Sequence, residues 1–340
     1  MIPLIDLTAL FAPASAARDA TDRAIMAAAT GAGFMTITAA PGLLPTDSPA
    51  RAALLRVFAL PEAQRARLLR RTFAPANPSV YRGWFPLQNG VGSYKEGIDM
   101  GPDIANPLRA EADPAGDPLR EPTPVPAEAA LPGWRAAAAA YYRNMERLGG
   151  LMMQSLARGL GLPERFFDAP FADGISTLRL IHYPPRPRDS FGDLPEAALW
   201  VEHDGERRYL LGGAHVDSGF VTLLAQDGVA GLQAEDSAGR WVDVPPAEAT
   251  LAVNFGGLLE RWTGGRIRAT RHRVIGLGRP RHSIPFFYEP AADAVIRTLP
   301  LPDAPEVAPF RYGDHLWAAM LRFPEFRGLE GARAPRGVHA

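Results

Sequence analysis

The chain has 340 residues, of which 47% are apolar and 21% charged, with a net charge of −1 and no cysteine. This composition is ordinary for a globular protein and excludes disulfides, thiolate metal sites and a cysteine nucleophile. The balanced charge provides no basic stripe for nucleic acid, and no uncharged apolar run is long enough to span a membrane. We therefore expect a cytoplasmic protein that binds neither nucleic acid nor membrane, with an oligomeric state that the composition leaves open.

The N-terminal part of the chain predicts short strands and helices. Threonine between apolar residues over 34–37 indicates a strand, and the stretch before Gly31 indicates a helix. Ten prolines between residues 72 and 130 predict a long loop-rich stretch, with aromatic segments at 81–84 and 94–101. The expected elements are a strand within 1–10, a helix over 17–30, a strand over 34–37, a helix over 48–58 and a basic helix from Pro61 to Arg71.

A strongly amphipathic helix is predicted over residues 134–160. Its apolar residues recur at steps of three and four, Pro132-Gly133 precedes it, and Gly161 and Pro163 follow it. The methionines and aromatic residues of this stripe are expected to pack in the core. The helix is therefore predicted to support the β-rich part that follows.

A β pattern begins near residue 177. Short runs separated by turn residues, at intervals of roughly 8–12 residues, predict an antiparallel sandwich or jelly roll. Residues 186–207 are expected to form a polar loop, and 237–239 and 264–265 to form hairpin loops. The expected strands are 178–183, 208–216, 219–226, 230–235, 240–244, 250–255, 266–276 and 282–288, followed by a connector over 292–310, a helix over 312–323 and a ragged tail.

Two histidines and an aspartate form the most informative pattern in the chain. His215 and Asp217 are two residues apart, so on an extended strand their side chains lie on the same side. His272 follows in a second strand-like run. Two imidazoles and one carboxylate are the ligand set of non-heme Fe(II) oxygenases, which leaves coordination positions open for substrate and O₂. The sequence therefore predicts an Fe(II) site in which His215, Asp217 and His272 are the metal ligands and the catalytic residues.

Arg281 and Ser283 repeat the period of two shortly after His272. A guanidinium binds both oxygens of a carboxylate at once, and a neighbouring hydroxyl adds a further hydrogen bond. We therefore expect these two side chains to bind a carboxylate.

The sequence around these residues resembles the 2-oxoglutarate/Fe(II)-dependent dioxygenases, in the branch that includes isopenicillin N synthase. The resemblance covers HVDSGFVTLLAQDGVAGLQAED (215–236), GRWVDVPP (239–246), LAVNFGGLLERWTGGRIRATRHRV (251–274) and RHSIPFFYEP (281–290). It implies a mainly β fold with flanking helices. A double-stranded β-helix (jelly-roll) core at 173–290 would follow a mixed α/β region at 1–172 and precede a connector, helix and tail at 291–340.

The resemblance also implies the chemistry. The enzyme would use Fe(II), 2-oxoglutarate and O₂ to oxidise a C–H bond of a small molecule, most often by hydroxylation, and would release succinate and CO₂. Arg281 and Ser283 would hold the far carboxylate of 2-oxoglutarate, and Tyr183 in LRLIHYPP would add a hydroxyl contact.

Two other functions stay open from the sequence. An oxidase of the isopenicillin N synthase type would use the same iron site without 2-oxoglutarate, and Arg281 and Ser283 would hold the carboxylate of its substrate. The synthase has a glutamine ligand in its tail, whereas this chain has no glutamine after Gln233, and His339 would have to replace it. A binding protein without activity is disfavoured because the whole ligand set is present.

The chain departs from many relatives at two places, which put the substrate in doubt. Residues 254–257 (Asn-Phe-Gly-Gly) lack an acidic residue, and Ile181 stands where many relatives have asparagine. Strand alternation turns His182 and His282 away from the predicted site, so both are expected to be structural. His203 is predicted to lie in the polar loop, either at the surface or against the substrate.

Overall fold

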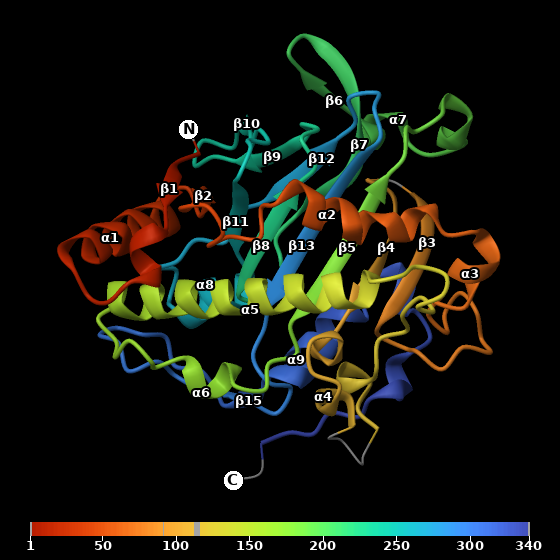
Figure 1. The fold of residues 1–340 in the computed structure, drawn as a ribbon. Helices are drawn as coiled ribbons and strands as arrows, with labels where there is room; N and C mark the ends of the chain where they lie inside the picture. The colour runs from red at the N-terminus through yellow and green to blue at the C-terminus, as the bar shows by residue number, and fades with distance from the viewer. Residues whose placement is uncertain (1, 91, 112–115, 339–340) are drawn as a thin grey trace.

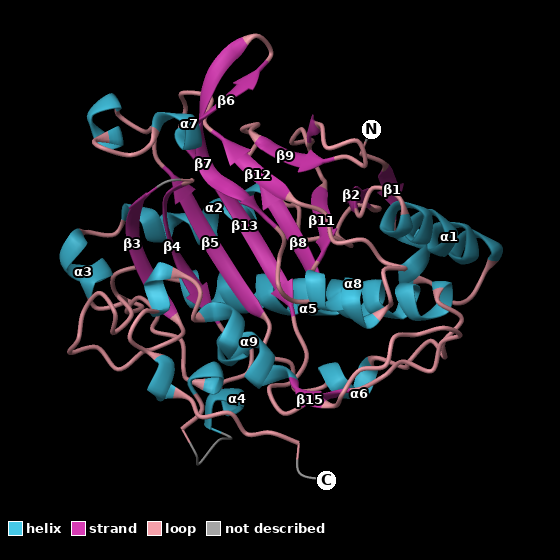
Figure 2. Ribbon diagram, turned by 180° about the vertical axis from the view of Figure 1, so that it is seen from behind, coloured by secondary structure: helices cyan, strands magenta, loops and turns pink. Residues whose placement is uncertain are grey.

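The computed structural model describes residues 2–90, 92–111 and 116–338. Its central feature is a sheet of 13 strands that curls into a jelly roll. The long helix α5 (Trp134–Gly159) lies across one face of this sheet (Figure 1). From behind, Figure 2 shows the other side, where the hairpin of β6 (Trp200–His203) and β7 (Glu206–His215) projects at the top. The predicted mainly β fold with flanking helices and a jelly-roll core is confirmed.

The structure has the following elements. The strands are β1 (Leu4–Asp6), β2 (Phe34–Thr38), β3 (Gly83–Gly90), β4 (Ser93–Met100), β5 (Thr177–Tyr183), β6 (Trp200–His203), β7 (Glu206–His215), β8 (Val221–Gln226), β9 (Leu232–Glu235), β10 (Trp241–Asp243), β11 (Leu251–Phe255), β12 (His272–Ile275), β13 (Arg281–Tyr288), β14 (Val295–Ile296) and β15 (Phe310–Arg311). The α-helices are α1 (Ala16–Thr30), α2 (Ser48–Leu55), α3 (Glu62–Ala66), α4 (Leu108–Glu111), α5 (Trp134–Gly159), α6 (Asp168–Phe171), α7 (Glu196–Leu199), α8 (Gly257–Trp262) and α9 (Tyr312–Met320).

The order of strands in the sheet brings distant parts of the chain together. It runs β1-β2-β11-β8-β13-β5-β4-β7-β12-β9-β10, with β3 on β4 and β6 on β7. Of the strands from the N-terminal region, β2 pairs with β11 and β4 pairs with β5 and β7, while β1 and β3 extend the sheet by pairing with β2 and β4. The sheet therefore contains strands from both sides of residue 172. The predicted division of the chain into regions at residues 172 and 290 stays a prediction.

Helix α5 is held on the sheet by its apolar side, as its periodicity predicts. Tyr142 packs edge-on against Phe286 of β13, with ring centroids 5.0 Å apart, and its hydroxyl donates a 2.8 Å hydrogen bond to the carbonyl of Ser176. Gly149 lets the helix approach the sheet, because a Cβ there would lie 2.4 Å from the ring of Tyr288. The prediction of a helix over 134–160 is confirmed.

Two segments that the sequence predicts as loops contain strands. Within 72–130, β3 and β4 form a hairpin, and a register shift between Phe85 and Gln88 accommodates Pro86. Within 186–207, α7 is followed by β6, which pairs with β7. The prolines and the polar composition of these segments suggested loops, although both segments form strands that pair with the next strand along the chain.

Two further expectations about helices and turns are wrong in detail. The basic helix near Pro61 ends at Ala66, because the next residues join β3 through a 2.7 Å hydrogen bond from the Trp84 amide to the Leu68 carbonyl. Gly264-Gly265 follows the unpredicted helix α8 and does not join two strands. The strand expected over 266–276 accordingly begins only at His272.

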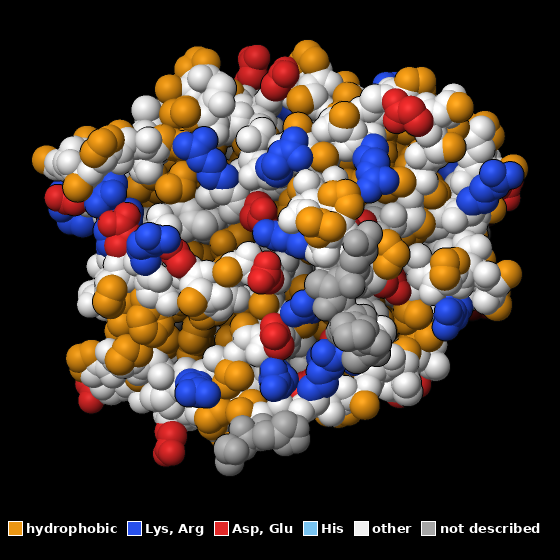
Figure 3. Space-filling model, turned by 60° about the horizontal axis from the view of Figure 1, so that its bottom comes forward, with side chains coloured by type: hydrophobic (Ala, Val, Ile, Leu, Met, Phe, Trp, Pro, Cys, Tyr) orange, Lys and Arg blue, Asp and Glu red, His pale blue; other side chains and the backbone are white. Residues whose placement is uncertain are grey.

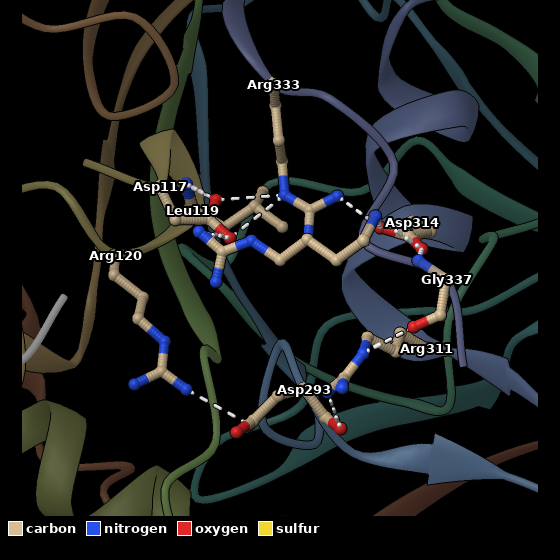
Figure 4. A network of polar contacts seen from close by, with 9 residues as sticks. Asp117, Leu119, Arg120, Asp293, Arg311, Asp314, Arg333 and Gly337 are labelled. Atoms are coloured by element: carbon tan, nitrogen blue, oxygen red, sulfur yellow. Dashed lines mark hydrogen bonds and ion pairs between the residues drawn. The ribbon is translucent and has the colours of Figure 1, made fainter. Parts of the chain in front are cut away.

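The C-terminal tail is ordered by ion pairs, which corrects the expectation of a ragged tail (Figure 4). The Nε of the buried Arg333 donates to both oxygens of Asp117 at 3.0 Å, and its Nη1 donates to Asp314 of α9 at 2.6 Å. Arg311 adds a 2.6 Å hydrogen bond to the carbonyl of Gly337. His339 lies outside the described residues.

The surface agrees with the near-neutral net charge of −1. Acidic and basic side chains are interspersed over the face of the molecule in Figure 3. Within the described ranges, the structure contains no helix that is both long enough and apolar enough to cross a membrane.

Candidate active site

The structure brings His215, Asp217 and His272 together at one point. His215 ends β7 and lies opposite His272, the first residue of β12, in the ladder between the two strands. The Nε2 atoms of His215 and His272 lie 3.6 and 3.8 Å from Oδ1 of Asp217. Asp217 follows two residues after the end of β7, so the turn, and not a continuous strand as expected, directs its carboxylate to the histidines. Three nitrogen and oxygen atoms at such spacing could hold one metal ion.

Backbone carbonyls orient both imidazoles. Nδ1 of His215 lies 2.8 Å from the carbonyl oxygen of Gly213, and Nδ1 of His272 lies 3.2 Å from that of Thr270. A carbonyl only accepts hydrogen bonds, so Nδ1 carries the proton in both rings. The Nε2 lone pairs are then directed toward Asp217, and this is the tautomer that a histidine needs as a metal ligand.

The second oxygen of Asp217 accepts two hydrogen bonds. Thr222 of β8 donates from its hydroxyl at 2.6 Å, and Asn254 of β11 donates from its amide at 2.8 Å. Burial raises the pKa of the Asp217 carboxyl, but the interactions of the carboxyl with His272 and His215 and the hydrogen bond from Thr222 outweigh burial and hold the pKa well below its usual range. Asp217 is therefore an anion with Oδ1 left for a cation.

Sequence reasoning missed the roles of Thr222 and Asn254. The available signal was Asn254 itself, a polar residue within the apolar strand β11 whose side chain is buried. The pairing of β11 with β8 places Asn254 opposite Thr222, so both side chains reach Asp217 from neighbouring strands.

Arg281 and Ser283 lie on one face of β13, as predicted, and both are 1% exposed. Arg281 donates through Nη2 to Gln226 at 3.2 Å and lies over the ring of Tyr183 at 5.2 Å. Within the described part of the chain, its Nε and Nη1 and the Oγ of Ser283 have no hydrogen-bond partner. Buried polar atoms without partners are costly, so this donor set fits an anionic group with several acceptor oxygens.

Gln226 was not predicted, and Tyr183, which was predicted, lies beside Arg281. Gln226 lies opposite Ser283 in the β8–β13 ladder, which only the register reveals. Tyr183 lies opposite Arg281 in the β5–β13 ladder and supports the guanidinium with its ring face. Its predicted hydroxyl contact to 2-oxoglutarate stays a prediction.

Three other histidines, His182, His203 and His282, have partners outside this group. His182 and His282 stack on each other at 4.7 Å on the opposite face of the sheet, against Phe58, so their predicted structural role is confirmed. His203 of β6 hydrogen-bonds to Asp243 at 3.0 Å. With Asp204, these two residues form a second, more exposed group of possible metal ligands.

Comparisons with known proteins agree with this geometry. Residues 174–290 match the family model of the 2OG-Fe(II) oxygenase superfamily. The chain is 30% identical over 310 residues to the 2-oxoglutarate-Fe(II) type oxidoreductase hxnY of Emericella nidulans, covering 88% of this chain and 82% of that protein. It is also 30% identical over 331 residues to the isopenicillin N synthase of Streptomyces clavuligerus, covering 93% of each.

Solved structures give the same result. A full-length Neurospora crassa protein in complex with alpha-KG superposes with a TM-score of 0.77 at 25% identity, covering 94% of this chain and 96% of that chain. A putative 2OG-Fe(II) oxygenase family protein from Caulobacter crescentus gives a TM-score of 0.72 at 25% identity, covering 95% and 99%.

The fold and the site define a non-heme iron oxygenase. The chain belongs to the 2OG-Fe(II) oxygenase superfamily, in the part that includes isopenicillin N synthase. It is an enzyme of this superfamily, whose cofactor is Fe(II) and whose co-substrates are 2-oxoglutarate and O₂.

Proposed function

We propose that the enzyme hydroxylates a C–H bond of a small molecule, and that His215, Asp217 and His272 hold its Fe(II). The observation that carries the proposal is the convergence of two Nε2 lone pairs and one carboxylate oxygen, each fixed from behind by a backbone carbonyl or by Thr222 and Asn254. Two imidazoles and one carboxylate leave about half of an octahedral ion's positions open for co-substrate and O₂.

Arg281 and Ser283 would bind the far carboxylate of 2-oxoglutarate. Their three unpartnered buried donor atoms supply hydrogen bonds to two carboxylate oxygens, while Gln226 and the Tyr183 ring hold the guanidinium in place. Arg281 and Ser283 would therefore fix one end of the co-substrate.

The protein residues position and protect the reacting groups. When bound, Fe(II) with 2-oxoglutarate and O₂ supplies the oxidising power, with release of succinate and CO₂. The side chains of Asp217 and His272 are largely shielded from water, whereas that of His215 is exposed, and backbone carbonyls, Thr222 and Asn254 fix the orientation of the three residues.

A small-molecule substrate is supported by the relatives. The full-length Neurospora crassa protein was also solved with alpha-KG and 5-formyluracil, and that structure superposes with a TM-score of 0.74 at 26% identity. A rice dioxygenase for auxin oxidation gives a TM-score of 0.67 at 25% identity. No comparison assigns the substrate of this chain, and its cytoplasmic location stays a prediction from the sequence.

The test is anaerobic. Adding 2-oxoglutarate to the Fe(II)-loaded protein should produce the weak visible charge-transfer band of a chelated keto acid, and admitting O₂ should then release succinate. An iron-loaded protein that gives neither band nor succinate, even with a panel of small molecules, would favour the isopenicillin N synthase type of oxidase. That alternative is kept because the identity to the synthase extends over nearly the whole chain.

A further inference from the structure

Lys95 is the only lysine in the chain, among 36 basic residues that are otherwise arginine. It lies in β4, next to β5 and β7, and is only partly exposed. A flexible, strongly hydrated ammonium is an unusual choice in this arginine-rich protein, so its surroundings are informative.

The neighbours of Lys95 along β4 show which way it points. Glu96 is on the outer face, where it forms ion pairs with Arg65 at 3.2 Å and with His182 at 2.9 Å. Residues alternate along a strand, so Lys95 is on the inner face. Gly97, two residues further, lies opposite Ile181, which in turn lies opposite Ser283. Lys95 therefore shares the inner face with the predicted carboxylate-binding residues.

The same strand also approaches the metal ligands. Ser93, two residues before Lys95, lies opposite Gly212 of β7, and Gly212 lies opposite Val274 of β12. Val274 is two residues after His272. Pairing through β7 thus links Lys95 of β4 to the strand that carries His272.

Among residues 2–90, 92–111 and 116–338, none forms a hydrogen bond or ion pair with the Lys95 ammonium. Two carboxylates near this face have other partners and do not neutralise Lys95. Asp99 pairs with Arg70 and Arg179, and Asp217 belongs to the proposed metal-binding triad. A cation placed inside a site without a counter-charge is a binding site for an anion from outside.

Charge balance indicates which anion is missing. A doubly charged iron with the Asp217 carboxylate leaves a single positive charge, and Arg281 adds another. These two positive charges balance the two negative charges of 2-oxoglutarate. The positive charge of Lys95 then has no counter-charge. On the basis of the proposed function, we propose that Lys95 binds a carboxylate of the substrate, which makes the substrate a small carboxylic acid.

The single lysine makes a direct test practical. Reductive methylation with isotope-labelled formaldehyde marks Lys95 and the N-terminal amine, and the variant Lys95→Arg identifies the Lys95 resonance by its loss. Mn(II) in the protein should broaden this resonance, whereas diamagnetic Zn(II) should not. If Mn(II) left the width of the Lys95 resonance unchanged, the placement of Lys95 beside the metal would be wrong.

The probes are benzoate, phenylacetate and hexanoate, each compared with its own primary amide. They are added to the Zn(II) protein with saturating 2-oxoglutarate. An acid should shift the Lys95 resonance and bind about tenfold more tightly than its amide, because the ammonium forms a charge-assisted hydrogen bond only with the carboxylate. If no acid shifts the resonance, or if the amides bind as tightly, the proposal is wrong.

Two variants separate substrate binding from other roles. Binding of acids by the unlabelled variants is followed through the change in the Fe(II)–2-oxoglutarate charge-transfer band under anaerobic conditions. Lys95→Met should lose the preference for acids over amides, and Lys95→Arg should keep it. The affinity of Lys95→Met for 2-oxoglutarate should stay within about twofold of wild type, and a tenfold loss would assign Lys95 to the co-substrate instead. If the wild-type protein gave no Fe(II)–2-oxoglutarate charge-transfer band, the proposed function itself would be wrong. This outcome is distinct from a failure of the Lys95 proposal alone.

Discussion

Asn254 of β11 donates a 2.8 Å hydrogen bond to Oδ2 of Asp217, a residue 37 positions earlier in the chain. The bond crosses from the strand to the turn after β7 and leaves Oδ1 facing the two histidines. Asn254 is 3% exposed, so water cannot easily replace the amide if it is removed. The asparagine thus fixes which oxygen of Asp217 is offered to a metal.

We expect Asn254→Ala to weaken metal binding without removing a ligand. Loss of a hydrogen bond that orients a ligand typically lowers metal affinity by about 10–100-fold. Anaerobic Fe(II) titration measures this change, and Thr222→Ser serves as the control because it keeps a hydroxyl donor to Asp217. Wild-type affinity in Asn254→Ala would show that Thr222 alone orients the carboxylate.

Substitution of the proposed metal ligands should reduce iron binding more than substitution of Asn254. His215→Ala and Asp217→Ala should each abolish stoichiometric Fe(II) binding and succinate formation, with circular dichroism unchanged. The matched control is His203→Ala, which removes a histidine from the more exposed group formed with Asp204 and Asp243. Loss of iron in the control, and not in the two triad variants, would move the metal site to that group.

Arg281→Lys tests the geometry of the carboxylate site. Lysine keeps the charge but loses the planar, two-pronged set of donors, so the affinity for 2-oxoglutarate should fall by about 1.5–3 kcal/mol. Quenching of protein fluorescence or the charge-transfer band reports the affinity. Arg279→Lys is the control, since Arg279 is two residues away and exposed. Equal affinities in wild type and Arg281→Lys would exclude bidentate binding.

The sequence predicts the residues that we propose carry the chemistry and misses those that support them. His215 with Asp217, and Arg281 with Ser283, were predictable because each pair is encoded within three consecutive positions. Side-chain direction follows directly from such spacing when the segment is extended. The contact of the distal His272 with this pair depends on the pairing of β12 with β7, which no local rule specifies.

The supporting residues depend on strand register, which the sequence does not specify. Thr222 and Asn254 meet Asp217 only because β8 pairs with β11, and Gln226 meets Arg281 only because β8 pairs with β13. The hairpin β3–β4 was hidden by Pro86, which a bulge accommodates. Long-range pairing therefore accounts for the missed hydrogen bonds, whereas strand β3 was missed because of its proline.

A buried glutamate provides a prediction for the dependence of stability on pH. Glu289 follows β13, is 5% exposed, and accepts a 2.8 Å hydrogen bond from the Tyr312 hydroxyl, while its Oε2 has no partner within the described residues. Burial raises the pKa of Glu289 to about 7, and the Tyr312 hydrogen bond and the charges of Arg82 and Arg179 oppose this rise only in part. The folded protein therefore favours the protonated carboxyl.

The sign of the effect follows from this pKa. In the unfolded chain the Glu289 carboxyl has its ordinary pKa of 4.5, so its contribution to stability is fully present below pH 4.5 and is lost as the pH rises through about 7. The loss should be on the order of 3 kcal/mol between pH 4.5 and pH 8. Glu289→Gln keeps the shape and an acceptor for Tyr312 but cannot ionise, so its urea midpoint should fall less than that of wild type over this range. Glu306→Gln, at an exposed acidic position, is the control and should follow wild type. Parallel pH profiles for wild type and Glu289→Gln would show that Glu289 keeps an ordinary pKa in the folded protein.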